Sequence, residues 1–394
     1  MDPNMRITVD RKVMLIVSTS LVLFTILGAM MGRVVAVEGP YGYLKLFNEA
    51  LYLIVNNYVQ PVQIDSLMEG AYRGMLESLD PANEYLSPSE YGRAAGGEDA
   101  GPADVGLALS KRRGYAVVVA ARPKSPASEA GLKTGDVLMS IDGRTTRKMG
   151  AWEASQALRG KPGTRTTIVV GLADAGGKKT LALARKTLSP LPPSGTLVPP
   201  GVGVVRIAGI REGDAKRLDQ SIAALKSEGI DRLLLDLRGC VSDSLPEAIG
   251  MASLFVGDGT IVTVADRYEG DKAYKADGRR LAWERQVAVL VDEGTARTCE
   301  VLAAALRDGL GAPLLGQRTW GSGTLQRLIP LRNGDGLLLA VGKFLSPAGK
   351  EWNGKGIEPD LQIPGSEADP GDPQRQKAID YVRGLSLPAR RNAA

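Results

Sequence analysis

The feature that most constrains the fold is an alternation of apolar strand-like runs and helical patterns between residues 203 and 339. The strand-like runs are short and rich in Val and Leu, as is typical of strands buried on both faces. In order, we expect a strand at Gly203–Ile207, a helix at Asp214–Glu228, a strand at Leu233–Leu237, a helix at Leu245–Phe255, a strand at Val287–Val291, a helix from Thr298 and a β-rich tail that includes Leu337–Leu339. This alternation predicts an α/β core with a mainly parallel sheet. The loops after Leu237 and Val291 would then hold the site, because sites lie beyond the carboxyl ends of such strands.

The chain has no histidine among its 394 residues. Ser-His-Asp and Cys-His catalytic arrangements and His-based zinc sites are therefore excluded, and a hydrolytic mechanism would need Lys, Asp, Glu or an N-terminal amine as its base. The net charge of +5 is spread along the chain without a basic block. We therefore expect no nucleic-acid partner. We also expect no cofactor and no metal.

Residues 13–32 form a run without charged side chains, preceded by Arg6, Arg11 and Lys12. At about 1.5 Å per residue, about 20 residues match the roughly 30 Å of hydrocarbon in a bilayer. The positive charges favour a cytoplasmic N-terminus, residues 1–12, and an exported body. We favour an uncleaved, single-pass transmembrane anchor in the cell inner membrane, with the body in the periplasm or otherwise outside the cytoplasm. A cleaved signal ending at Val34-Val35-Ala36 and a buried soluble helix are the alternatives.

Helical spacing of apolar residues over residues 40–92 predicts an N-terminal helical region. A glycine-rich linker then leads into residues 103–186, where short β-type runs are separated by glycines. Within this region, Ser125–Gly143 and Leu158–Thr164 resemble the central and later stretches of a PDZ domain. By that resemblance, a peptide would add as a strand with its free carboxylate held by backbone amides. The peptide-binding loop and strand would consist of Val105, Gly106, Leu107, Ala108 and Leu109.

The order of these parts and several short motifs resemble the carboxyl-terminal processing peptidases, also called tail-specific proteases. The motifs are Leu79-Asp80-Pro81, the PDZ stretch, Leu235–Gly239, Val291–Ala296, Thr319–Gln326 and Gly354–Asp360. The resemblance implies a protease-like α/β core at residues 201–364 and leaves a C-terminal tail at residues 365–394. It also implies a serine endopeptidase in which a lysine activates the nucleophile and the PDZ domain presents the substrate's carboxyl end.

Carried onto this chain, the resemblance places the nucleophile at Cys299, the lysine base at Ser322 and the residue that orients the base at Gln326. The loop whose amides help to hold the oxyanion falls on Gly239, Cys240, Ser242 and Asp243. A serine hydroxyl cannot replace lysine as a base near neutral pH, although a cysteine could still act as a nucleophile. A carboxylate at Asp243 would oppose the developing negative charge, and losing one oxyanion donor costs about 3 kcal/mol.

These departures favour a proteolytically inactive homologue that acts as a membrane-anchored peptide-binding or scaffold protein. Its partners would be protein or peptide carboxyl termini at the PDZ domain and the membrane at residues 13–32, and a homo-oligomer is left open. One alternative is an active endopeptidase that cleaves near the carboxyl terminus, with Cys299 as nucleophile and Lys343 or Lys350 as base. A structural envelope protein that binds no peptide is the other.

Cys240 and Cys299 are the only cysteines of the chain, and the resemblance places them on facing loops of one site. We favour two separate thiols, because facing loops need not meet the strict geometry of a disulfide. The alternative is a disulfide, which an oxidising compartment would promote if the Cα atoms lay within about 7 Å of each other.

Overall fold

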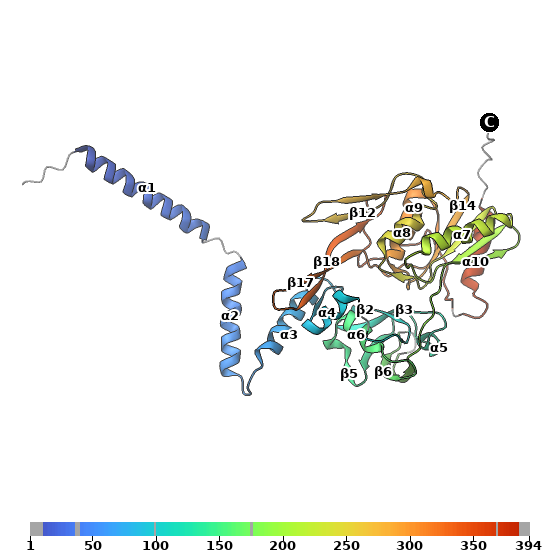
Figure 1. Cartoon of the computed structure of the whole chain (residues 1–394), viewed down its shortest axis with the longest axis horizontal. Coiled ribbons are helices and arrows are strands. Elements are labelled where there is room, and N and C mark those ends of the chain that lie inside the picture. The colour runs from blue at the N-terminus through green and yellow to red at the C-terminus, as the bar shows by residue number, and fades with distance from the viewer. Residues whose placement is uncertain (1–10, 36–39, 98–99, 174–175, 368, 386–394) are drawn as a thin grey trace, which may run out of the picture. The chain divides into compact units, whose positions relative to one another are not determined.

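The computed structural model describes residues 11–35, 40–97, 100–173, 176–367 and 369–385 (Figure 1). Contacts divide the chain into two units, Met1–Gly70 and Ala71–Ala394. The predicted cytoplasmic segment, residues 1–12, lies outside the described residues except for its last two positions.

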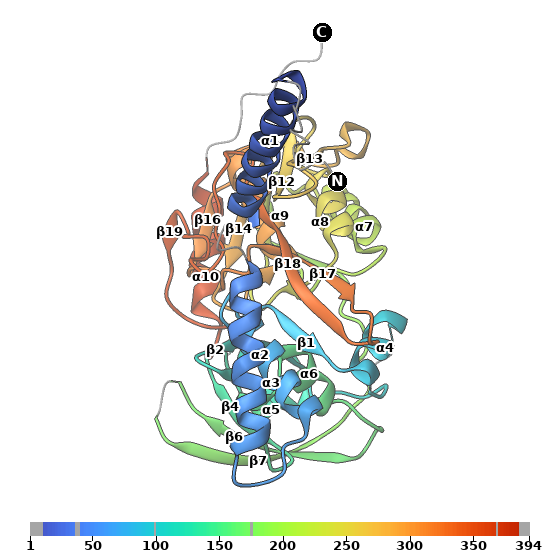
Figure 2. The same ribbon diagram turned by 90° about the vertical axis from the view of Figure 1, so that its left-hand side faces the viewer.

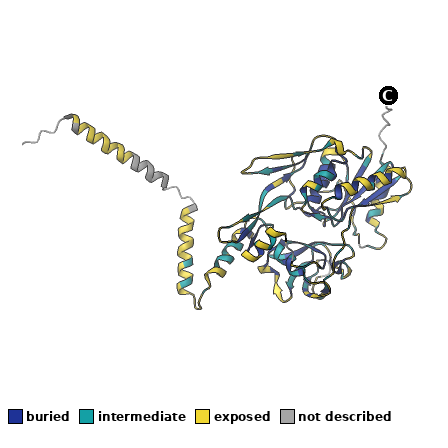
Figure 3. Cartoon of the chain, in the orientation of Figure 1, coloured by how far each residue is buried: buried dark blue, intermediate teal, exposed yellow. Residues whose placement is uncertain are grey.

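The first unit is helical, with α1 at Arg11–Val35 and α2 at Pro40–Asn57, and α3 (Ile64–Glu77) begins in it. The predicted anchor, residues 13–32, lies within α1, and the side chains of residues 13 and 27–32 are outside the described part. No helix among the described residues is long and apolar enough to cross a membrane. The large apolar side chains of α2 are mostly exposed (Figure 3).

Residues 103–186, predicted to form a PDZ domain and referred to by that name below, contain a six-stranded antiparallel sheet in the order β2-β3-β4-β6-β7, with β5 paired to β4 (Figure 2). The strands are β2 (Leu107–Arg112), β3 (Tyr115–Ala121), β4 (Val137–Ile141), β5 (Arg144–Thr145), β6 (Arg165–Gly171) and β7 (Lys178–Ala184). The two α-helices are α5 (Pro126–Glu129) and α6 (Ala151–Leu158), and a 3₁₀ turn, η1 (Thr146–Lys148), precedes α6. Because β2 ends the order of the sheet, one of its edges has no partner strand in the described part of the chain.

The core contains a six-stranded sheet in the order β19-β16-β14-β10-β9-β8. The strands are β8 (Ser194–Val198), β9 (Val202–Arg206), β10 (Arg232–Asp236), β14 (Gln286–Val291), β16 (Leu314–Gly316) and β19 (Leu361–Gln362). Only β8 pairs antiparallel to its neighbour. Alternate strand residues pack on opposite faces, so that Leu233 and Leu235 join one apolar cluster and Leu234 joins another.

Helices cover both faces of this sheet (Figure 1). The helices α7 (Asp214–Ser227), α8 (Leu245–Ala252) and α9 (Thr298–Leu310) contribute to the larger apolar cluster. The C-terminal helix α10 (Pro373–Gly384) packs Ala378, Ile379 and Val382 against the other face. Both faces of the sheet are therefore buried, as expected for strands rich in Val and Leu.

The prediction of a mainly parallel core is wrong for the core as a whole, because a second, five-stranded sheet there is antiparallel. Its strands are β1 (Glu84–Leu86), β18 (Gly336–Leu345), β12 (Thr260–Asp266), β13 (Lys272–Lys275) and β17 (Thr324–Pro330). A short turn with Gly334 at φ 91° joins β17 to β18. Periodicity within one strand does not reveal its partner, so the sequence pattern missed this hairpin. The strand β1 also interrupts the region predicted to be helical, which continues as α4 (Pro88–Gly96).

Candidate functional site

A cavity of about 930 Å³ lies between the PDZ domain and the loops of the core. The PDZ domain contributes the second half of β2, from Leu109 to Arg112, and α6 residues that include Trp152. The core contributes Arg297, Ser322 and their neighbours. The open edge of β2, where peptide binding is predicted, and the predicted catalytic loops therefore share one cavity.

The loops after β10 and β14 meet because these two strands are parallel neighbours, with Asp236 opposite Leu290. Each loop continues into a two-residue strand, β11 (Val241–Ser242) and β15 (Ala296–Arg297), and these pair in parallel. Helix α9 begins at the next residue. The two loops singled out from the sequence are thus brought together at the start of α9.

Two glycines permit this close approach. Gly239 has φ 59°, in the left-handed region that favours glycine. A Cβ on Gly294 would lie 3.0 Å from the Cα of Gly239, closer than real Cβ contacts usually are. Any side chain at Gly294 would therefore push the two loops apart.

Cys299 does not face the cavity. Its side chain is fully buried, and its sulfur is bonded to that of Cys240, with the two Cα atoms 6.0 Å apart. In α9 it shares the buried face with Ala303 and Leu306, which follow at helical spacing. The disulfide that we favoured less is formed, and it corrects the expectation of a thiol in the site. The helical spacing of the apolar residues was the signal that Cys299 belongs to the core.

Arg297, which the sequence reasoning missed, is the residue that precedes α9 and lines the cavity. Its backbone has φ 60° and ψ −126°, a conformation that L-residues rarely adopt and that concentrates at functional sites. Its Nη1 pairs with Asp243 Oδ2 at 2.6 Å, and its Nη2 donates to the Leu109 carbonyl at 3.3 Å. The Asp243 carboxylate is therefore paired rather than isolated. The available signal was the position just before the predicted helix start, where a side chain can point out of the core.

The buried carboxylate of Glu300 holds both sides of the site together. Its Oε2 accepts from the backbone amides of Arg297 at 3.1 Å and Ser322 at 2.7 Å. Its Oε1 accepts from the amide of Gly321 and the hydroxyl of Thr319. Burial raises the pKa of Glu300 to about 7, although these hydrogen bonds lower it. Residues 297 and 322 are therefore neighbours, because their amides bind one oxygen.

The remaining predicted catalytic positions have other contacts. Ser322 and Gln326 both line the cavity, and Gln326 also donates from Nε2 to the carbonyl of Ala82. The replacement bases considered from the sequence, Lys343 and Lys350, are absent from the residues that line this cavity. Within the described ranges, no group of three or more acidic or cysteine side chains is placed to hold a metal ion.

Models of three known protein families match parts of this sequence: Peptidase family S41 at residues 201–363, a PDZ domain at residues 117–170 and the activating protease CtpB N-terminal domain at residues 28–88. The C-terminal processing peptidase, chloroplastic, of Tetradesmus obliquus is 30% identical over 348 residues, which cover 83% of this chain and 75% of that protein. The chain belongs to the carboxyl-terminal processing protease family.

Two further comparisons agree with this membership. The carboxy-terminal processing protease CtpA of Bacillus subtilis (strain 168) is 29% identical over 349 residues, covering 88% of this chain and 74% of that protein. The solved structure of a photosystem II D1 C-terminal processing protease superposes with a TM-score of 0.69 at 29% identity, covering 81% of this chain and 92% of that one. The fold, with its PDZ domain and N-terminal helical region, is that of the family.

In this family member, the first backbone N–H groups of the predicted oxyanion loop already donate hydrogen bonds within the protein. Gly239 donates from its N–H to Asp292 Oδ1 at 2.8 Å, and Cys240 donates to the Leu237 carbonyl at 3.1 Å. Ser242 is buried and donates from its hydroxyl to a backbone carbonyl. The amides of residues 239 and 240 are therefore not free to hold an oxyanion.

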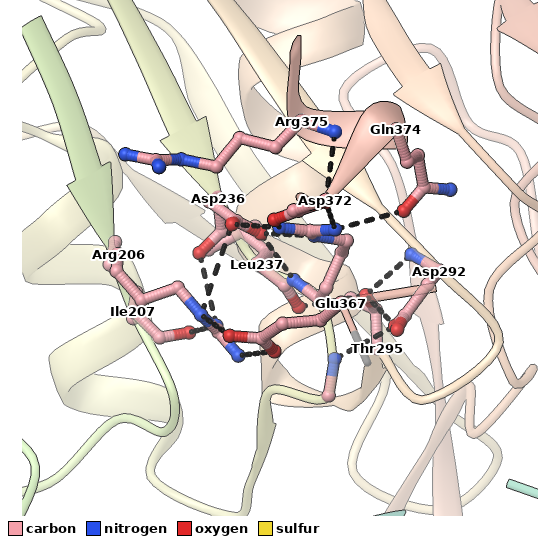
Figure 4. A network of polar contacts seen from close by, with 12 residues as sticks. Arg206, Ile207, Asp236, Leu237, Asp292, Thr295, Glu367, Asp372, Gln374 and Arg375 are labelled. Atoms are coloured by element: carbon pink, nitrogen blue, oxygen red, sulfur yellow. Dashed lines mark hydrogen bonds and ion pairs between the residues drawn. The ribbon is translucent and has the colours of Figure 1, made fainter. Parts of the chain in front are cut away.

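A buried ionic network fixes the strand end that carries this loop. Arg238 is 1% exposed, and its Nη2 lies 2.7 Å from both Asp236 Oδ2 and Asp372 Oδ2. Arg206 connects Asp236 to Glu367 in the same network (Figure 4). Burial raises the pKa of Asp236, but Arg206 and Arg238 outweigh this effect and hold that pKa below its usual value. Asp372 and Glu367 belong to the predicted C-terminal tail, so this network ties the tail to the site loop.

The predicted peptide-binding residues have different roles in the structure. Val105, Leu107 and Leu109 bury their side chains in the PDZ core. The amides of Val105 and Gly106 both donate to Asp104 Oδ1, at 2.6 and 3.3 Å, so they are not free to hold a peptide carboxylate. Of the five predicted residues, Val105 to Leu109, Leu109 lines the cavity.

The PDZ domain also contacts the core beside the site. The Arg112 guanidinium lies 3.8 Å from the Trp320 ring centroid and donates to the Trp320 carbonyl at 3.2 Å. Val117 and Val119 of β3 pack with Ala296 and Trp320 in one apolar cluster. The site loops are therefore braced by the PDZ sheet.

Glu84 of β1 is a second buried carboxyl, and it caps α6 by accepting from the amides of Trp152 at 2.8 Å and Glu153 at 3.1 Å. Burial raises its pKa from 4.5 to about 7. Glu84 and Glu300 therefore stabilise the folded state fully below about pH 4.5, and this contribution is lost as the pH rises through about 7. We expect the free energy of unfolding, measured in urea, to fall by about 1–3 kcal/mol between about pH 5.5 and pH 8.

The Glu84→Gln variant should show a clearly smaller fall over the same range, because it removes one of the two groups. Glu228→Gln, at an exposed position, is the matched control and should keep the original pH dependence. If the free energy of unfolding fell equally with pH in the Glu84→Gln variant and in the unmodified chain, the raised pKa of Glu84 would be contradicted.

Proposed function

We propose that this chain is a proteolytically inactive member of the carboxyl-terminal processing protease family that binds protein or peptide carboxyl termini through its PDZ domain. The observation that carries the proposal is that Arg297 lines the cavity at the start of α9, whereas Cys299 is buried in the core. A guanidinium remains protonated and serves neither as a nucleophile nor as a base. Ser322, which also lines this cavity, cannot supply the missing base. The Cys299 sulfur is in a disulfide and offers no thiolate.

Peptide binding is supported by the unpaired edge of β2, which opens into the shared cavity beside α6. Strand addition to such an edge gives affinity through main-chain hydrogen bonds, while adjacent pockets give specificity. None of these interactions requires a catalytic residue. The domain would therefore keep its recognition role without proteolysis.

The test is binding of the full chain to fluorescent peptides that end in small apolar residues, each with a free or an amidated carboxyl end. The amides of Val105 and Gly106 are engaged by Asp104, so a carboxylate would have to accept from N–H groups of the open β2 edge. We expect the free acid to bind more tightly, because a carboxylate is a stronger hydrogen-bond acceptor for such groups than an amide oxygen is. Equal affinities would favour strand addition without carboxylate capture. Absence of binding for every peptide would contradict the proposal and favour a structural role.

We further propose that residues 13–32 tether the exported body to the cell inner membrane. The flanking positive charges of the sequence support this orientation. The Cys240–Cys299 disulfide supports export, because such bonds persist in oxidising compartments. Protease added to intact spheroplasts should digest the body, and alkaline carbonate should not release it from membranes. Protection from the protease would contradict export.

A further inference from the structure

The backbone of Leu109 faces the open edge of β2. Val118 lies directly opposite Leu109 on β3. The N–H of Val118 donates to the Asp136 carbonyl at 2.8 Å, and its carbonyl accepts from Gly135 at 2.9 Å, on the side away from β2. Directly opposite residues in an antiparallel pair point their backbone groups either toward each other or both away. The N–H and carbonyl of Leu109 therefore point outward from the sheet.

Arg297 already donates a hydrogen bond to the carbonyl of Leu109. Its Nη2 donates to the Leu109 oxygen at 3.3 Å, while Asp243 holds its Nη1 at 2.6 Å. Its backbone is held by Glu300 and by the pairing of β15 with β11. The guanidinium thus lies where an added strand would place one of its own N–H groups.

We propose that Arg297 is a built-in competitor for the peptide-binding edge of the PDZ domain. A peptide that extends the sheet along β2 takes the Leu109 carbonyl only after Arg297 has left it. Asp243 is exposed and keeps the displaced guanidinium paired, so displacement does not leave an isolated charge. This inference rests on the proposed peptide-binding function. It assigns to Arg297, at the position where α9 meets the cavity, a regulatory contact with the open edge of β2.

The test compares peptide affinity of the full chain with that of the Arg297→Ala and Arg297→Gln variants. Removing a competing hydrogen bond should raise the affinity about two- to tenfold, for the free-acid and the amidated peptide alike. Arg327→Ala removes the same charge from an exposed position paired with Glu269, and its affinity should not change. Thermal unfolding of each variant, close to that of the unmodified chain, verifies that the fold is intact.

Unchanged affinity in both Arg297 variants, with clear binding by the unmodified chain, would overturn the competition and leave the peptide-binding function in place. Weaker binding of the free acid alone would also overturn it, because Arg297 would then be a receptor for the carboxylate. Absence of binding in every variant would remove the proposed function and the inference together.

Discussion

The double variant Arg297→Ser/Ser322→Lys should cleave an unfolded protein measurably, whereas the unmodified chain and Cys299→Ser/Ser322→Lys should not. Residue 297 lines the cavity, and its amide and that of residue 322 bind the same oxygen of Glu300. A serine and a lysine at these positions would therefore stand within reach of each other. Supplying a base to a nucleophile contributes about 10²- to 10⁴-fold in rate. A serine at position 299 would remain buried in the core.

The measurement is release of fluorescent fragments from an unfolded, labelled substrate, with each single variant as a control. Activity should stay below that of an intact family member, because the amides of Gly239 and Cys240 are engaged. In the double variant, Asp243 has lost its partner Arg297, and its unpaired carboxylate opposes the negative charge of the oxyanion. Adding Asp243→Asn removes that carboxylate and should therefore raise the rate of cleavage. Cleavage by the unmodified chain that disappears in Cys299→Ala would show that the protein is an active cysteine enzyme.

Reduction of the Cys240–Cys299 disulfide should lower the stability of the core by about 4 kcal/mol, because the bond closes a loop of 59 residues. For a unit of this size, the unfolding temperature should fall on the order of 10 °C. The measurement is thermal unfolding with and without a reductant. The physical reason is that the bond restricts the unfolded chain while it joins the site loop to α9.

The Cys240→Ala/Cys299→Ala variant is the matched control, and the reductant should not change its unfolding temperature. Thiol counting on unfolded, non-reduced protein should find no free thiol. Two free thiols in freshly isolated protein, or no effect of the reductant on the unmodified chain, would contradict the disulfide.

Much of the core could be predicted from the sequence, because its elements are long and strongly patterned. The strand expected at Val287–Val291 is β14, and the helix expected from Thr298 is α9. The helix expected at Asp214–Glu228 is α7, Asp214–Ser227. Apolar periodicity and glycine positions act locally, so they are readable without any tertiary contact.

The sequence also indicated which loops meet, because parallel neighbouring strands bring their carboxyl ends to one edge. It could not assign side chains within those loops. Cys299 and Arg297 are two residues apart, yet one enters the core and the other lines the cavity, because a strained turn at Arg297 separates β15 from α9. Such a turn is set by the contacts that hold it, and no residue pattern encodes it.

The family, the PDZ module, the alternation of the core elements and the loops that form the candidate site were therefore all predictable from local sequence patterns and motifs. The antiparallel sheet, the disulfide, the burial of Glu84 against α6 and the contact of Arg297 with Leu109 became apparent only in the folded chain. Each of these joins segments that lie far apart in the chain. Local patterns report the preferences of single elements, whereas such pairings depend on how packed elements place their side chains and edges.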